Sequence, residues 1–407
     1  MNLLFAWRYF RAKKSTNAIN IIAWVSMSAI VVGAASLILV LSVFNGFEDL
    51  VKSLYTSFYP DIKVSPASAK TMILTPEQLQ RLRSMPGIKA MSLVAQDRGI
   101  LEAGDQKVPA YVKGVDSNFL KVSGVGKNME HGKFETGTAD QPLTVLGSGI
   151  QATLEIEADR ALLPIGVYLF RRGSTDLSTN PMNSVNHESI ATAGDFRIQE
   201  DFDQNYAITN IGFVKRMTEM GPNEYTGAEL AIDDPSRAVQ IRDMIAQNLG
   251  KGYFVQTRYQ QNQDLYNVMG TEKWVIYIVL SLILVVAAFN MVGALTMLVW
   301  EKQKDIHVLK ALGASNGLIQ KIFLSEGLLL ALMGGIGGIL LAVIICLLQI
   351  RYHLVPLQGG SFLIDYYPVK LVGMDFVLVL STIVVVGILA SWLPARKAAR
   401  QPIELRS

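Results

Sequence analysis

The chain has 407 residues, of which 50% are hydrophobic and only 17% are charged. Soluble proteins carry about a quarter charged residues, so this composition excludes a disordered protein and argues against an ordinary soluble enzyme. The formal net charge of +3 is too small to indicate a protein that binds nucleic acid. The single cysteine, Cys346, excludes an internal disulfide and a cysteine metal cage.

The first segment, residues 1–18, mixes apolar and basic side chains and precedes a long apolar run. Leu3, Phe5, Trp7 and Phe10 flank Arg8, a pattern typical of a helix that lies in the membrane interface. We therefore expect a cytoplasmic interfacial helix here that contacts membrane lipids.

Four apolar runs follow, each near or above the roughly 18 residues that a helix needs to cross about 30 Å of hydrocarbon. The first run is longer than the apolar part of a signal peptide, and Val43-Phe44-Asn45 is a poor cleavage site, so it should remain as an anchor. The predicted transmembrane helices cover residues 19–45, 272–300, 322–350 and 376–394.

Apolar positions continue past the first span at alternating steps of three and four residues, to about residue 58. These positions are Phe44, Phe47, Val51, Leu54 and Phe58. A helix from Ile19 to Phe58 would be about 60 Å long, roughly twice the hydrocarbon thickness. Similar apolar positions lead into the second span, namely Val268, Val275, Ile276 and Val279. We predict that both helices project outward as a paired stalk; the alternative is that the stripes only pack beneath the inserted domain.

Residues 46–271, between the first two spans, have an ordinary soluble composition and are predicted to form an α+β domain. Thr75-Pro76-Glu77 should open a helix that a strand, Ile88–Val94, follows. Asp234-Pro235 should open a second helix, followed by the strand Tyr253–Thr257. We expect two helix–strand halves, at about residues 60–95 and 234–258.

The stretch between these halves, about residues 96–233, is predicted to be a β-rich subdomain with short strands and turns. The turns include Gly173–Asp176 and Thr179–Pro181. The predicted fold is therefore a membrane protein with four transmembrane α-helices and a large extracytoplasmic α+β domain between helices 1 and 2.

Basic residues indicate the orientation of the chain in the membrane. Four lie before the first span, four between the second and third, and four after the fourth: Arg8, Arg11, Lys13, Lys14, Lys302, Lys304, Lys310, Lys321, Arg396, Lys397, Arg400 and Arg406. The loop of residues 351–375 has only Arg351 and Lys370. We therefore place both termini, the loop of residues 301–321 and the tail of residues 395–407 in the cytoplasm, and the inserted domain outside.

The loop of residues 301–321 should hold a short amphipathic helix from Glu301 to Ala314. It has polar candidates for contact with a partner at Glu301, Lys304, Asp305 and Lys310, and a docking face of Ile306, Leu309, Leu312 and Gly313. Gly313 also suits the end of a helix. A helix held between two spans can transmit a push to both; the alternative is a helix that rests in the headgroups.

Other residues suggest packing rather than chemistry. Gly334 and Gly338 have the spacing that lets membrane helices approach closely, and Asn290 offers an amide within the second span. The sequence contains no Gly-x-x-x-x-Gly-Lys-Ser/Thr and no His-Glu-x-x-His. We therefore expect no catalytic residue and no metal site in this chain.

Motifs along the whole chain resemble those of permease subunits in the MacB/FtsX superfamily of ABC systems. In chain order they are the segment from Leu4 to Arg11, Ser42-Val43-Phe44-Asn45-Gly46-Phe47-Glu48, the loop from Glu301 to Ala314, Phe323 to Gly327, and Pro394 to Ala399. The segment from Ser42 to Glu48 points more narrowly to the lipoprotein-releasing LolC/LolE branch.

The resemblance implies a permease of the bacterial inner membrane that has no catalytic activity or cofactor of its own. A separate LolD-like ATPase would bind ATP and Mg and dock on the loop of residues 301–321, and a second permease copy or a paralogue would complete the complex. Acylated lipoproteins would be extracted from the membrane and passed to a LolA-like periplasmic chaperone. Acyl chains would then meet the two apolar stripes, Phe44, Phe47, Val51, Leu54 and Phe58 with Val268, Val275, Ile276 and Val279.

Three alternatives remain open at this stage. One is a MacB-like efflux permease, although no ATPase domain is fused to the chain. Another is an FtsX-like regulator of cell-wall hydrolases, for which the inserted domain is large. A third is a membrane-anchored binding protein without an ATPase, which would leave the loop of residues 301–321 unexplained.

Overall fold

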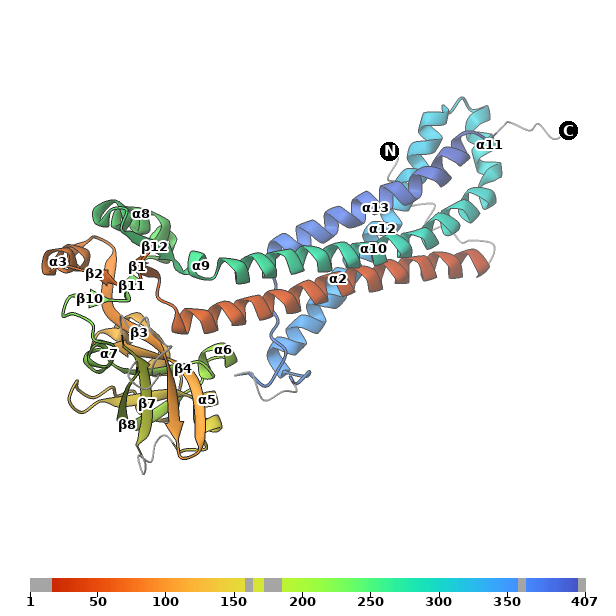
Figure 1. The fold of residues 1–407 in the computed structure, drawn as a ribbon. Coiled ribbons are helices and arrows are strands. Elements are labelled where there is room, and N and C mark those ends of the chain that lie inside the picture. The colour runs from red at the N-terminus through yellow and green to blue at the C-terminus, as the bar shows by residue number, and fades with distance from the viewer. Residues whose placement is uncertain (1–16, 158–163, 172–184, 358–363, 402–407) are drawn as a thin grey trace, which may run out of the picture. The chain divides into compact units, whose positions relative to one another are not determined.

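A computed structural model describes residues 17–157, 164–171, 185–357 and 364–401 (Figure 1). The predicted interfacial helix, except residues 17 and 18, and the predicted turns at residues 173–176 and 179–181 lie outside these residues. The chain divides into two compact units. The helical unit comprises Met1–Leu50, Asn267–Leu357 and Asp365–Ser407, and the inserted domain comprises Val51–Tyr266 and Gln358–Ile364.

Long helices form the helical unit. They are α2 (Asn17–Phe58), α10 (Gln263–Glu301), α12 (Asn316–Tyr352) and α13 (Gly373–Ala399), with the short α11 (Gln303–Ala311) between α10 and α12. Within the described residues, the four long helices are the ones with the length and apolar composition to cross a membrane, which confirms the predicted number of spans. With 42 and 39 residues, α2 and α10 are each about 60 Å long.

Glycines let α12 lie close to two neighbouring helices. A Cβ added at Gly338 would overlap the Val31 carbonyl oxygen of α2, and one added at Gly334 would lie 3.0 Å from the Ile30 side chain. Gly335 of α12 faces the second neighbouring helix, α13, where it contacts the side chain of Ile383. The Gly334–Gly338 spacing therefore lies in the contact between α12 and α2.

The helices α2 and α10 lie side by side in the helical unit (Figure 1). A Cβ added at Gly33 would lie 3.1 Å from the Leu284 side chain. The hydroxyl of Ser26 donates to the Asn290 carbonyl oxygen at 3.0 Å. Contacts at these two levels pair the two helices within this unit.

The inserted domain is built on a ten-stranded mixed sheet with the order β12-β1-β11-β3-β4-β9-β6-β8-β5, in which β7 pairs with β3 and β8. Its strands are β1 (Ile62–Pro66), β3 (Ile88–Ala103), β4 (Gln106–Val115), β5 (Met129–Gly132), β6 (Leu143–Gly147), β7 (Ile165–Phe170), β8 (Val185–Phe196), β9 (Tyr206–Asn210), β11 (Gly227–Ile232) and β12 (Tyr253–Thr257). The strands β2 (Met72–Ile73) and β10 (Glu224–Tyr225) form a separate pair. This architecture, with four long helices, confirms the predicted fold class.

The prediction that a strand ends at Val94 was wrong, because β3 continues to Ala103. Its first half, Ile88–Val94, pairs with β11, and its second half pairs with β4 and β7. Gly99 lies where the backbone of β7 approaches, so that an added Cβ would crowd the Tyr168 carbonyl oxygen. One strand thus joins the region of the two helix–strand halves to the β-rich region.

Helices cover the sheet. They are α3 (Pro76–Ser84), α4 (Phe119–Val122), α5 (Ser148–Leu154), α6 (Glu200–Asp203), α7 (Ile211–Thr218), α8 (Ala238–Leu249) and α9 (Arg258–Gln261). Thr75 and Gln78 form a capping box that starts α3. Leu82 of α3 and Ile241 and Ile245 of α8 share one buried cluster. The two helix–strand elements that the sequence predicts therefore pack against a common core.

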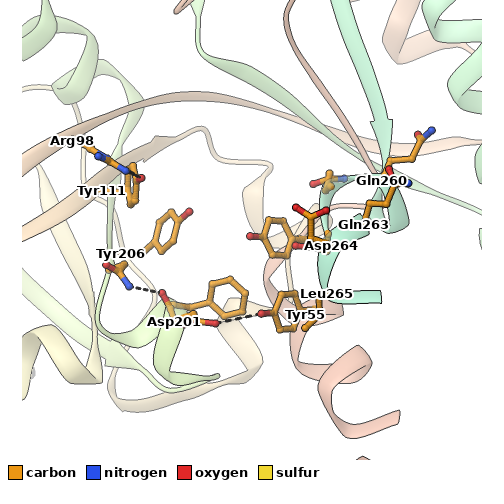
Figure 2. Close-up of a pocket in the computed structure, with 14 residues that line it drawn as sticks. Tyr55, Arg98, Tyr111, Asp201, Tyr206, Gln260, Gln263, Asp264 and Leu265 are labelled. Carbon is orange, nitrogen blue, oxygen red and sulfur yellow. Dashed lines mark hydrogen bonds between the residues drawn. The ribbon is translucent and has the colours of Figure 1, made fainter. Parts of the chain in front are cut away.

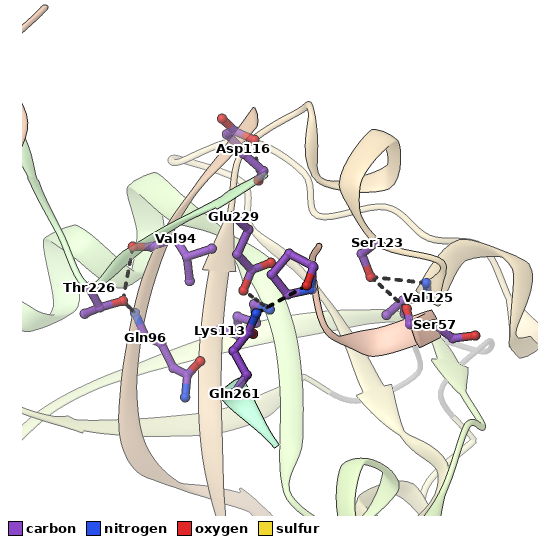
Figure 3. Close-up of polar contacts among 12 residues, drawn as sticks. Ser57, Val94, Gln96, Lys113, Asp116, Ser123, Val125, Thr226, Glu229 and Gln261 are labelled. Carbon is purple, nitrogen blue, oxygen red and sulfur yellow. Dashed lines mark hydrogen bonds and ion pairs between the residues drawn. The ribbon is translucent and has the colours of Figure 1, made fainter. Parts of the chain in front are cut away.

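A buried ion pair crosses the sheet of the inserted domain (Figure 3). Lys113 Nζ on β4 lies 2.7 Å from Glu229 Oε1 on β11, and the two side chains are 3% and 4% exposed. The ammonium group also lies 5.0 Å from the ring centroid of Phe58 and 4.9 Å from that of Phe119. Burial lowers the pKa of Lys113, and the attraction of Glu229 opposes that shift.

Asp203, at the end of α6, makes the stability of the inserted domain depend on pH. Burial raises the pKa of Asp203 to about 6, although its carboxylate accepts the Ile198 N–H at 2.9 Å. Because the folded pKa exceeds the unfolded one, the favourable contribution of this group is complete below about pH 4 and is lost as the pH rises through 6.

We expect Asp203→Asn and the parent to have similar unfolding temperatures at pH 4. As the pH rises to 7, the unfolding temperature of Asp203→Asn should increase steadily relative to that of the parent, because only the parent must bury a charged carboxylate. A temperature difference that stays constant over this range contradicts the assignment.

Candidate functional site

The helix α11 is shorter than the sequence predicts. It comprises Gln303–Ala311, so Glu301 is the last residue of α10, and Leu312 and Gly313 follow α11. Lys302 leaves helical geometry between the two helices, with φ −91° and ψ 12°. Gly313 has φ +91°, a conformation that favours glycine, and ends the segment as predicted.

Of the four residues in the docking face that the sequence predicts, Ile306 and Leu309 are turned toward the helical unit, whereas Leu312 and Gly313 are exposed. Ile306 is 1% exposed and belongs to the buried core of the helical unit. Leu309 lines a small space together with Ile319 and Phe323 of α12. The reason is that α11 folds back onto the first turns of α12, which then cover its apolar side. The exposed apolar side chains are Val308 at 59% and Leu312 at 80%.

Polar residues of this segment tie it to the rest of the helical unit. Lys310 Nζ donates to the Ala399 carbonyl oxygen at 2.9 Å and also to the Gln401 carbonyl oxygen, at the end of α13. Asp305 lies 3.4 Å from Lys302 Nζ, whereas Lys304 is exposed. We name residues 302–314 the coupling segment. It contacts both α12 and α13, so a displacement of the segment would be passed to both helices.

The apolar stripe of α2 divides between two environments. Phe58 is 2% exposed and its ring stacks on Phe202, with the centroids 4.2 Å apart, inside the core of the inserted domain. Leu54 packs against the same cluster. Phe58 is therefore not available to an acyl chain, and for these two residues the packing alternative holds.

The apolar candidates of α10 are more accessible. Val268, Val275 and Val279 are between 53% and 54% exposed, and Ile276 is half-buried. On α2, Phe47 meets Tyr367 edge to face, with ring centroids 5.8 Å apart, while Phe44 and Val51 are half-buried. Asn290 also has an exposed side chain, and only its carbonyl oxygen bonds to α2.

A polar cluster that no motif in the sequence indicated joins three helices of the helical unit. Asn45 Nδ2 donates to Asp375 Oδ2 at 2.6 Å, and Lys273 Nζ donates to Asn45 Oδ1 at 2.8 Å. Lys273 and Asp375 also form an ion pair at 3.2 Å. The available signal was that each residue is polar and lies at the edge of an apolar run. We name Asn45, Lys273 and Asp375 the polar junction.

Comparison with known proteins supports a relationship along the full chain. Residues 277–403 match the family FtsX-like permease C-terminal, and residues 23–170 match the MacB-like periplasmic core domain. The lipoprotein-releasing system transmembrane protein LolE of Haemophilus influenzae is 27% identical, over 99% of this chain and 98% of its own. LolC of Neisseria meningitidis is 26% identical, over 98% of each chain. The chain is therefore similar along its full length to the LolC/LolE permeases, and both family matches belong to the MacB/FtsX superfamily.

This likeness, together with the four apolar helices, supports a multipass protein of the inner membrane with a periplasmic domain. The names of these relatives give them as transmembrane proteins of the lipoprotein-releasing system, and the family model that matches residues 277–403 is that of a permease. Among solved structures, the periplasmic region of MacB from Actinobacillus actinomycetemcomitans aligns with a TM-score of 0.37 and 13% identity. That alignment covers 54% of this chain and 98% of the MacB region.

Proposed function

We propose that this permease extracts acylated lipoproteins from the outer leaflet of the inner membrane, using ATP hydrolysed by a partner subunit. The full-length likeness to LolE and LolC, whose names state that system, supports the proposal. Each buried methylene of an acyl chain costs about 0.8 kcal/mol to expose, so extraction needs an energy source. The released lipoprotein passes to a LolA-like periplasmic chaperone.

The proposal includes a LolD-like ATPase, which holds ATP and Mg, and a second permease copy or a paralogue. Both termini and the coupling segment lie in the cytoplasm, and acyl chains meet the exposed valines of α10. One observation carries the proposal furthest. The coupling segment is anchored to α13 through Lys310 and packed on α12 through Ile306, while Leu312 remains exposed for a partner.

Leu312→Asp tests this assignment. We expect the variant to reduce ATP-dependent release of lipoprotein from proteoliposomes by about tenfold or more, because a charge replaces an exposed apolar contact in the partner interface. The permease, the ATPase and a lipoprotein are reconstituted together, and release to the soluble chaperone is measured. Leu309→Asp is a poorer test, since it places a charge within the packing of the helical unit itself.

Leu354→Asp is the matched control. Leu354 is 63% exposed but follows α12 at its other end, so the same substitution should leave release unchanged. Equal release by the parent and Leu312→Asp would contradict docking at this position. ATP-dependent activity without lipoprotein release, but with export of a small molecule or activation of a wall hydrolase, would favour the efflux or regulatory alternatives.

A further inference from the structure

A cavity of about 650 Å³ lies within the inserted domain (Figure 2). In Figure 2, Arg98, Tyr111, Asp201 and Tyr206 stand on one side of it, and the end of α2, α9 and the start of α10 form the other. Pockets of this volume commonly hold small ligands or short peptide segments. The proposed function so far assigns this cavity no role.

Aromatic rings make up much of the cavity wall. Tyr55 and Tyr59 stack with centroids 5.7 Å apart, Tyr59 meets Phe202 at 5.5 Å, and Tyr111 stacks on Tyr206 at 5.3 Å. The faces of aromatic rings carry negative potential and attract cations. Burial, with smaller contributions from neighbouring acidic groups, raises the pKa of Tyr59 to about 12, so its hydroxyl stays neutral.

Some charged side chains of the cavity already have hydrogen-bond partners, and others do not. Arg98 is already committed, since its Nε donates to the Tyr111 hydroxyl at 2.8 Å and its guanidinium carbon lies 4.9 Å from that ring centroid. Asp201 accepts the Tyr55 hydroxyl at 3.3 Å. Among the described residues, the Asp264 carboxylate and the Gln261 Oε1 atom have no hydrogen-bond partner. Both of these groups are acceptors, which a donor in the ligand would satisfy.

From this arrangement we propose that the cavity binds a lysine or arginine side chain carried on an extended polypeptide segment. The ammonium or guanidinium group lies against the tyrosine rings and donates to Asp264 and Gln261. Charge-assisted hydrogen bonds of this kind are roughly twice as strong as those between neutral groups.

Carboxamides around the cavity favour a polypeptide over a free cation. Asn205, Gln260, Asn262 and Gln263 line the walls. Each amide group has both donors and acceptors, so it matches the N–H and C=O groups of a peptide backbone. On the proposed function, this polypeptide is the lipoprotein being released; the binding chemistry itself does not depend on that function.

Binding of short capped peptides to the full-length permease in detergent tests the inference. The probes are Gly-Ser-Lys-Ser-Gly and the same peptide with Gln or Glu at the centre, and calorimetry gives their dissociation constants. We expect the Lys peptide to bind about tenfold more tightly than the Gln peptide, and the Glu peptide to bind most weakly. Asp264→Asn should abolish the preference for Lys.

Two control variants distinguish loss of the proposed cation contacts from nonspecific destabilisation of the domain. Asp105→Asn removes a carboxylate from the exposed turn between β3 and β4, away from the cavity, and should keep the preference. Tyr55→Phe keeps the aromatic face and should also keep it, whereas Tyr55→Leu should weaken binding of the Lys peptide. Four results would each overturn the proposal. They are equal binding of the three peptides, a preference for the Glu peptide, no binding of any peptide, and an unchanged preference for Lys in Asp264→Asn.

The same preparation distinguishes this inference from the proposed function. If the Lys peptide binds as expected but reconstituted permease and ATPase release no lipoprotein, the cavity assignment stands and the proposed function fails. If release proceeds while no peptide shows a preference, the proposed function stands and the cavity assignment fails.

Discussion

Lys113→Met is expected to destabilise the inserted domain by about 3–5 kcal/mol, because it leaves the Glu229 carboxylate buried without its counter-charge. Glu229 is 4% exposed, and its Oε2 atom has no hydrogen-bond partner among the described residues. Water therefore cannot replace the lost ammonium group. Hydrogen exchange of the full chain measures the effect locally: amides of β4 and β11 should exchange on the order of 150- to 5000-fold faster, while those of α12 keep the parent rate.

Two further variants separate loss of the charge pair from loss of the lysine stem. Lys107→Met removes a lysine from the same strand, but Lys107 is 60% exposed where it pairs with Glu102, so exchange should barely change. Lys113→Met combined with Glu229→Met replaces both charges by apolar groups and should restore most of the protection. Exchange in the double variant as fast as in Lys113→Met would show that the pair itself is not the cause.

Local patterns were sufficient to predict the long helices and the capped helices of the inserted domain. An apolar run of about 20 residues has few alternatives to a membrane helix, and Thr75 followed by Gln78 contains the complete starting signal of α3. These features depend on residues that are close together in the sequence. The length of β3 was missed for the opposite reason, since its second half is fixed by pairing with β4 and β7.

The coupling segment shows a second limit of sequence patterns. The spacing of Ile306, Leu309 and Leu312 indicates residues on one side of a helix, but it does not say what covers that side. In the structure the helix ends before Leu312, so that Ile306 is covered by the helical unit and Leu312 is not. The polar junction was missed because Asn45 is 228 residues from Lys273 and 330 from Asp375.

Gly46→Ala is expected to loosen the polar junction and destabilise the helical unit by about 1–3 kcal/mol, as overpacking typically does. A Cβ at position 46 would overlap the Pro368 carbonyl oxygen, which belongs to the segment leading into α13. The adjacent Asn45 bonds to Asp375, and the Lys370 N–H donates to the Ser42 carbonyl oxygen at 2.9 Å. Displacing this segment would strain both contacts.

Gly293→Ala, on α10, is the matched control, because no atom lies within 4 Å of the Cβ that it would add. Alanine is favoured over glycine within a helix by about 1 kcal/mol, so this variant should unfold at the same or a higher temperature than the parent. Gly46→Ala should therefore lower the unfolding temperature of the detergent-solubilised permease, whereas Gly293→Ala should leave it unchanged or raise it. Similar shifts for both would contradict the packing argument at Gly46.

The position of the polar junction also predicts an effect of Gly46→Ala on lipoprotein release. The junction ties α2, α10 and α13 together, and α13 also receives the Lys310 contact from the coupling segment. If that chain of contacts transmits movement, the complex of the partner ATPase with the Gly46→Ala permease should hydrolyse ATP at nearly the parental rate while releasing less lipoprotein per ATP. The ratio of released lipoprotein to hydrolysed ATP in proteoliposomes measures this directly. An unchanged ratio in a variant that unfolds at a lower temperature would mean that the junction stabilises the permease without taking part in transmission.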